Sequence, residues 1–221
     1  MSRNNLQRAI DLVNENGFIL VFPIHNKAEP QSLWSLLYPN IKMKWEWDGE
    51  EDGRLADLWR MREKLASSGC VIYGKFYHGR ATLFSKKVFT NLLAVNGSAE
   101  VELVNRESRA ILDALEMDSP LSTKQLKMAA DLRGKFLEKN YNNALKELWQ
   151  NFLIVAVGEI DDGAFPSLAH ASTQTMFEEL WIQSQQIDPL DAMLELLELK
   201  EYHLLETLFL HKLRETQKTS L

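Results

Sequence analysis

The segment between residues 105 and 169 restricts the possible folds of this chain more than any other part of its sequence. Apolar residues recur there at helical spacing in three successive stretches. The stretches cover residues 108–115, 122–132 and 141–152. Ser122 and Gln125 open the second stretch with the spacing of a capping box, in which each side chain bonds the other residue's backbone amide. The segment therefore predicts three consecutive helices.

Two extended segments follow the third predicted helix. The apolar run 152–157 predicts a strand, the acidic residues 158–163 predict a turn, and residues 164–168 predict the returning strand. Three helices followed by a two-stranded hairpin is the element order of a winged helix-turn-helix. We predict such a domain over residues 101–170.

Residues 1–100 predict a mixed region of helices and short strands, related to a helix-turn-helix. Gly79 lies between two extended segments, at a position where a positive φ would close a hairpin. The expected elements are a helix ending near Asn16, a strand at 18–22, short helices at 32–37 and 55–65, hairpin strands at 71–73 and 81–84, and a helix capped by Ser85.

The last region, residues 171–221, predicts a helical extension that packs back on the body. Asp188 and Pro189 have the order of a helix N-cap and first helical position, and the apolar residues suffice for two helices. The whole chain is therefore expected to be mostly α with short β-hairpins, in the α+β class, with regions 1–100, 101–170 and 171–221. No internal repeat is visible in the sequence.

The charge of the chain limits the ways in which it could bind nucleic acid. Its formal net charge is -6, which argues against a protein that coats nucleic acid through bulk electrostatic attraction. Any contact with DNA is expected to be local.

Cysteine and histidine usage predicts neither a disulfide nor a metal site. Cys70 is the sole cysteine, and the five histidines lack metal-type pairing with one another or with acids. No cofactor motif is present, so no cofactor is expected. No apolar run is long enough to cross a membrane, and we expect a cytoplasmic protein without a membrane partner.

The first candidate site is the polar face of the third predicted helix. Asparagine can pair with adenine edges and lysine can reach guanine or phosphate. The candidate residues are Lys139, Asn140, Asn142, Asn143 and Lys146. The alternative is a solvated face, on which Glu138 and Glu147 cancel the lysines.

A second candidate is a basic cluster interleaved with aromatic residues. A cationic hairpin tip with aromatic neighbours suits a phosphate backbone or an unstacked base. The cluster comprises Lys75, His78, Arg80, Lys86 and Lys87, among Tyr73, Phe76 and Tyr77. The alternative is an exposed turn followed by an ordinary helix start.

Three stretches of the chain resemble small proteins related to the AlkZ/YcaQ winged-helix DNA glycosylases. These stretches are 58–85, 119–125 and 141–158, within a likeness that covers most of residues 5–170. The resemblance implies a tandem winged-helix architecture and affinity for duplex DNA, including damaged DNA.

The catalytic motif of those glycosylases, Gln-x-Gln or Gln-x-Asp, belongs in the N-terminal third. That third contains only Gln7 and Gln31, neither in such a motif. Gln186-Ile-Asp188-Pro189 has the pattern but lies near the C-terminus, where a helix N-cap explains it.

The sequence leaves three functions open. We expect a DNA-binding protein that is non-catalytic or catalytically degenerate. The first alternative is a DNA-repair glycosylase acting on alkylated or crosslinked bases. The second is a winged-helix module for a protein partner, favoured by the net negative charge and by Trp45 and Trp47 in the acidic loop 42–53.

Overall fold

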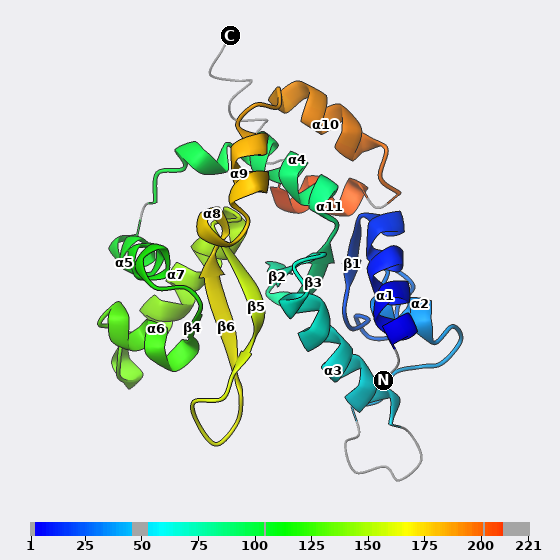
Figure 1. Cartoon of the computed structure of the whole chain (residues 1–221), viewed down its shortest axis with the longest axis horizontal. Helices are drawn as coiled ribbons and strands as arrows, with labels where there is room; N and C mark the ends of the chain where they lie inside the picture. The colour runs from blue at the N-terminus through cyan, green and yellow to red at the C-terminus, as the bar shows by residue number, and fades with distance from the viewer. Residues whose placement is uncertain (1–2, 46–52, 104, 201, 210–221) are drawn as a thin grey trace.

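The helices of the protein surround one six-stranded antiparallel sheet (Figure 1). The computed structural model describes residues 3–45, 53–103, 105–200 and 202–209. The strand order is β1-β3-β2-β5-β6-β4, so the strands of the N-terminal half and those of the following half form adjacent parts of one sheet. The chain is therefore a mixed α+β protein, as predicted.

The first half follows the predicted order of elements. Its elements are α1 (Arg3–Asn16), β1 (Phe18–Leu20), α2 (Leu33–Leu37), α3 (Arg54–Ser67), β2 (Ile72–Tyr77), β3 (Arg80–Phe84) and α4 (Lys86–Asn96). Ser85 caps α4 by accepting from the Val88 amide. His78 and Gly79 both have positive φ, which lets a two-residue turn join β2 to β3.

The second half also has the predicted order. After η1 (Ser98–Glu100) come α5 (Arg106–Met117), β4 (Leu121–Ser122), α6 (Thr123–Ala129), η2 (Lys135–Leu137), α7 (Glu138–Gln150), β5 (Ile154–Ile160) and β6 (Ser167–Ser172). The capping box between Ser122 and Gln125 is confirmed. The predicted hairpin was placed too early in the chain, because β6 begins at Ser167 and the exposed Phe165 lies in the connecting loop.

The two halves repeat one arrangement that the sequence does not reveal. Each runs helix, strand, helix, helix, hairpin, and the strand orders β1-β3-β2 and β4-β6-β5 correspond. The halves join where Tyr73 of β2 pairs with Ala156 of β5. Because these strands are antiparallel, the β2–β3 turn and the β5–β6 loop lie at opposite ends of the sheet.

Aromatic side chains fill the junction between the halves. The Phe76 ring centroid lies 5.3 Å from that of Trp149 on α7 and 5.6 Å from that of Phe152. Gly74 lies under these rings, since a Cβ there would lie 2.5 Å from Phe76 Cε2 and 2.6 Å from Trp149 Cζ3. The absence of a side chain at Gly74 allows α7 to pack on β2.

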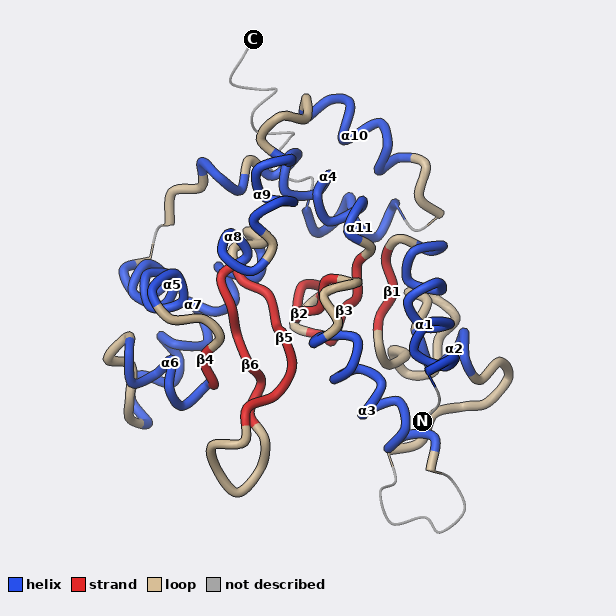
Figure 2. The backbone as a smooth tube through the Cα atoms, viewed as in Figure 1, coloured by secondary structure: helices blue, strands red, loops and turns tan. Residues whose placement is uncertain are grey.

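A buried ion pair also crosses the junction. Arg62 of α3 binds the Glu159 carboxylate of β5 and donates a 3.2 Å hydrogen bond to the Tyr73 hydroxyl. Its guanidinium carbon lies 4.1 Å from the centroid of the Trp59 ring. The third helix of each half packs on the hairpin of the other half, α3 on β5 and α7 on β2. Figure 2 shows α3 beside β5.

The C-terminal region folds back over α4 and contains four helices within the described residues. They are α8 (Thr173–Met176), α9 (Glu178–Ser184), α10 (Pro189–Leu197) and α11 (Tyr202–Phe209). Both α9 and α10 contact α4. Asp188 is the N-cap of α10 and Pro189 its first residue, which confirms that prediction.

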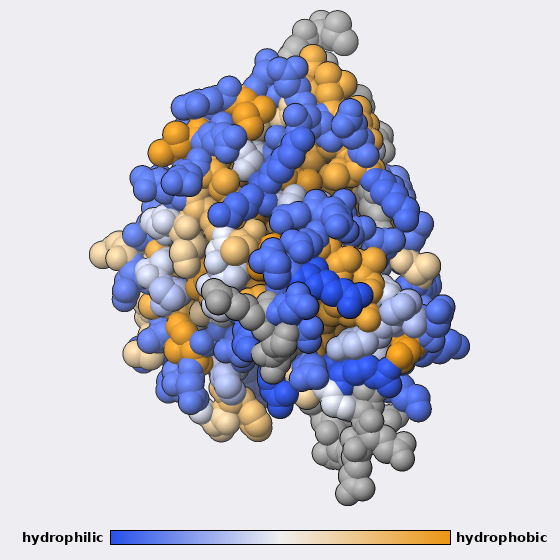
Figure 3. Space-filling model, turned by 45° about the vertical axis from the view of Figure 1, so that its right-hand side comes forward, coloured by the Kyte–Doolittle hydropathy of each residue, from blue (hydrophilic) through white to orange (hydrophobic). Residues whose placement is uncertain are grey.

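The face of the molecule shown in Figure 3 is mainly hydrophilic, with apolar side chains interspersed among polar ones. Within the described residues, no helix is long and apolar enough to span a bilayer. The exposed apolar residues include Phe136 and Phe165, which are 99% and 84% exposed. Both lie in connecting segments of the second half.

Candidate nucleic-acid interface

Helix α7 has one buried side and one polar side. Tyr141, Ala144 and Leu148 are buried, and α7 packs on α5. Four of the predicted contact residues are exposed on the opposite side, at spacings of three, four and seven residues that place them on one helical face. We call this the outer face of α7: Lys139, Asn142, Asn143 and Lys146, followed by Gln150.

The two glutamates of α7 make contacts with other helices. The Glu138 carboxylate forms an ion pair with Lys127 of α6, with 2.6 Å between Oε2 and Nζ. Glu147 accepts from the Ser108 hydroxyl and, at 2.6 Å, from the Asn105 amide, both at the start of α5. Neither glutamate belongs to the outer face. This argues against the alternative of a solvated face on which Glu138 and Glu147 neutralise the charges of Lys139 and Lys146.

Asn140 differs from the other predicted contact residues of α7. Its side-chain amide donates a 2.9 Å hydrogen bond to Glu107 of α5. This bond lowers the pKa of the Glu107 carboxyl, since it favours the ionised form. The structure therefore places Asn140 at the contact between α7 and α5 and leaves it outside the outer face.

Sequence reasoning missed the segment that leads into α7. Gly134 has a φ of 102°, and Arg133, Lys135 and Phe136 beside it are all exposed. Lys135 lies in η2, the turn that leads directly into α7, so it adds a positive charge near the start of that helix. The signal was a glycine flanked by two cations and followed by an aromatic residue that belongs to no apolar stripe.

The second predicted cluster does not form one patch. Lys75, His78 and Arg80 are exposed around the β2–β3 turn. Lys86 and Lys87 are exposed at the start of α4, beyond the far end of β3. Six residues separate Arg80 from Lys86, and a strand rises about 3.3 Å per residue. Closeness in sequence thus does not bring these cations together.

Lys87 is engaged with the C-terminal region. Its ammonium lies 2.9 Å from the Glu195 carboxylate of α10, to which Asn91 also donates at 3.1 Å. The hydrogen bonds from Lys87 and Asn91 lower the pKa of Glu195. This contact gives Lys87 a structural role in holding α10 on α4.

A buried histidine lies in the sheet near Lys75. His170 of β6 is 3% exposed, and its ring centroid is 5.9 Å from that of Trp149. Burial, together with the nearby charge of Lys75, lowers the pKa of His170 to about 4. The imidazole is therefore neutral at physiological pH. Among the described residues, no group of three potential metal ligands occurs.

The Gln-x-Asp string near the C-terminus lies on the surface. Gln186 and Asp188 are both exposed, and the Asp188 carboxylate accepts a 2.7 Å hydrogen bond from the Leu190 amide. These residues therefore connect α9 to α10.

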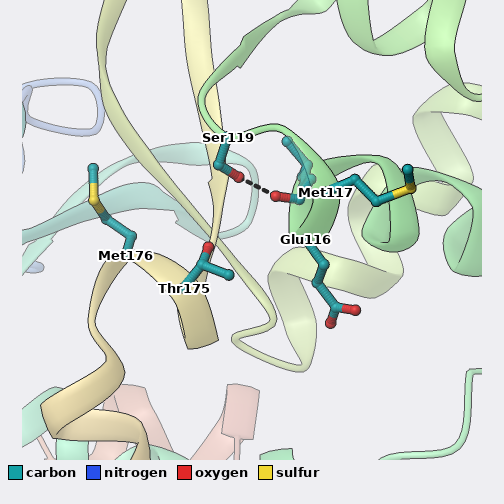
Figure 4. A pocket seen from close by; sticks show the side chains of 6 residues that line it. Glu116, Met117, Ser119, Thr175 and Met176 are labelled. Atoms are coloured by element: carbon teal, nitrogen blue, oxygen red, sulfur yellow. Dashed lines mark hydrogen bonds between the residues drawn. The ribbon is translucent and has the colours of Figure 1, made fainter.

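A pocket lies between the end of α5 and α8 (Figure 4). Its lining comprises Leu115, Glu116, Met117, Ser119, Thr175 and Met176. Ser119 donates its hydroxyl to the Leu115 carbonyl, so it is already engaged within the fold. Glu116 is the sole ionisable residue of this lining, which therefore lacks a glutamine-carboxylate pair.

Most of the acidic loop 42–53, namely residues 46–52 with Trp47, lies outside the described residues. Trp45 is 59% exposed, and its ring centroid lies 5.1 Å from that of Phe22. The ring of Trp45 is thus anchored on one side and open to solvent on the other.

The model of a protein family described as AlkZ related matches residues 3–207. The chain matches no curated protein and no solved structure.

Proposed function

Because the chain belongs to the AlkZ-related family, we propose that it binds duplex DNA and that the outer face of α7 contacts the DNA. Membership of this family points to a DNA-binding or DNA glycosylase-like protein. We further propose that each half is a winged helix-turn-helix. The repeated order of helices and strands supports this proposal.

The observation that carries the proposal is the separation of charges on α7. Lys139 and Lys146 are exposed on one face with Asn142 and Asn143 between them, while Glu138 and Glu147 bind other helices. A helix inserted into the major groove needs this combination, because its lysines can meet phosphates and its amides can meet base edges. An acidic protein can bind DNA if its carboxylates lie away from such a face.

Fluorescence anisotropy with a labelled duplex tests the proposal. We expect binding at low salt, weakened by Lys139→Ala and Lys146→Ala and unchanged by Lys64→Ala. Lys64 is a matched control, because it is an exposed lysine on helix α3. Absence of binding at low salt would refute the proposal. If the protein does not bind DNA but forms a stable complex with another protein, the protein-interaction alternative is favoured.

We also propose that the Gln186-to-Asp188 string has no catalytic role. The cap formed by Asp188 supports this, since its carboxylate is committed to the Leu190 amide on an exposed turn. Release of a base from alkylated duplex, measured as abasic-site formation, is the test. Base release that Gln186→Ala abolishes would contradict this assignment and would favour the glycosylase alternative.

A further inference from the structure

Phe136 is almost completely exposed at the entrance to α7. It is 99% exposed and lies in η2, the single turn between Gly134 and the first residue of α7. A phenylalanine ring in water forgoes the burial that stabilises this side chain in a core. Because single apolar residues are often exposed, the case for a contact at Phe136 depends on the side chains around it.

The surroundings of Phe136 are cationic. Arg133, Lys135 and Lys139 are exposed within three residues of it, and none lies within 4 Å of a carboxylate in the described part of the chain. Glu138, the acidic neighbour, binds Lys127 instead. An aromatic ring flanked by cations has the chemistry of a nucleic-acid contact, in which cations bind phosphates and the ring stacks on a base.

Phe165 is nearly as exposed but has a different environment. It lies in the β5–β6 loop, where Asp161 and Asp162 precede it. Asp162 accepts hydrogen bonds from Ser122 and, at 3.0 Å, from Ser167, and these bonds lower the pKa of its carboxyl. Two aspartates within four residues of Phe165 disfavour a phosphate contact in this loop, because like charges repel. Charge thus distinguishes the two exposed phenylalanines.

We propose that Phe136, with Arg133 and Lys135, forms a site for an unstacked base, so that the protein prefers duplex DNA whose stacking is interrupted. This inference rests on the proposed binding of DNA by α7. In intact duplex, insertion of the ring must first unstack a base step, which costs a few kcal/mol. At an abasic position that cost is already removed, and the ring can fill the gap.

The test compares the affinities for two labelled duplexes that differ only in a single central tetrahydrofuran abasic site. The wild-type protein is expected to bind the abasic duplex more tightly. Phe136→Ala should reduce that preference by about 5-fold or more, the loss expected for one stacking contact. Phe136→Tyr should retain the preference because a tyrosine ring also stacks.

Two controls separate stacking from other effects. Phe165→Ala removes an equally apolar exposed ring and should leave the preference unchanged. Lys139→Ala should weaken the binding of both duplexes by the same factor, because a phosphate contact does not depend on stacking. Thermal unfolding of Phe136→Ala should match that of the wild type, since the ring is solvent-exposed.

The outcomes distinguish this inference from the proposed function. If the wild type binds neither duplex at low salt, DNA binding itself is refuted. If it binds both duplexes equally, or if Phe136→Ala keeps the preference, DNA binding stands and the site at Phe136 is refuted. The latter result would leave a protein partner as the explanation for the exposed ring.

Discussion

The side-chain amide of Asn140 on α7 donates a 2.9 Å hydrogen bond to the carboxylate of Glu107 on α5. This bond gives two neighbouring asparagines of one helix different roles. Asn140 fixes α7 against α5, whereas Asn143 lies on the outer face between two lysines. A polar helix face is thus divided between a structural contact and the surface that we propose for DNA.

The first prediction compares those two asparagines. Asn143→Ala should weaken duplex binding by about 1 kcal/mol, or five-fold, the typical contribution of one hydrogen bond. Asn140→Ala should change the affinity by less than about two-fold, because its amide faces Glu107. Anisotropy titrations of both variants measure the difference. Equal losses of affinity in the two variants would contradict the assignment of Asn140 to a structural contact and of Asn143 to the DNA-binding face.

The second prediction concerns the pH dependence of stability. The pKa of His170 is about 4 in the folded state against about 6.5 for a solvent-exposed histidine, so the unfolded chain binds the proton more readily. The contribution of His170 to the free energy of unfolding is therefore fully present above pH 6.5. It decreases by up to about 3 kcal/mol as the pH falls toward 4. Urea unfolding between pH 5 and 7 measures the slope. His170→Leu should flatten it, and an unchanged slope would exclude His170 as its source.

The third prediction tests the ion pair between the halves. Arg62→Ala should lower the free energy of unfolding by about 3–5 kcal/mol, because Glu159 then keeps a largely buried charge without its partner. Arg62→Met combined with Glu159→Leu should recover most of that loss, since an apolar pair needs no compensating charge. Urea unfolding of the single and double variants distinguishes the two effects. A double variant as unstable as Arg62→Ala would contradict this account.

The fourth prediction addresses the close packing of α7 on β2. Gly74→Ala should destabilise the protein by about 1–3 kcal/mol, because its Cβ would overlap the rings of Phe76 and Trp149. Gly163→Ala is the matched control, since the nearest atom to its added Cβ is the Phe165 carbonyl oxygen at 3.8 Å. Thermal unfolding should separate the two variants. Equal melting temperatures would refute the packing role of Gly74.

Local signals in the sequence predicted the starts of α4, α6 and α10 correctly. Ser122 with Gln125, Ser85, and Asp188 with Pro189 each form the predicted cap, because caps depend on residues only a few positions apart. The second strand of the β5–β6 hairpin was misplaced because it depends on distant pairing. Four of its six residues are serine or alanine, which have little intrinsic preference for strands, and they form a strand by pairing with β5 and β4.

The candidate site was predictable only in part, for the same physical reason. Helical spacing identified Lys139, Asn142, Asn143 and Lys146 as one polar row. Spacing could not show that Glu107 lies beside Asn140, since thirty-three residues separate them. The repeated arrangement of the two halves is also visible only in the strand pairing. The sequences of the two halves show no repeat from which it could be predicted.

The most direct test of the central claim is the salt dependence of duplex binding. The logarithm of the association constant should fall linearly with the logarithm of the salt concentration. The slope should decrease by about one for each phosphate-contacting lysine that is removed. The Lys139→Ala, Lys146→Ala double variant is therefore predicted to lose about two units of slope, while Lys64→Ala keeps the wild-type slope. A double variant with the wild-type slope would show that the outer face of α7 does not contact DNA.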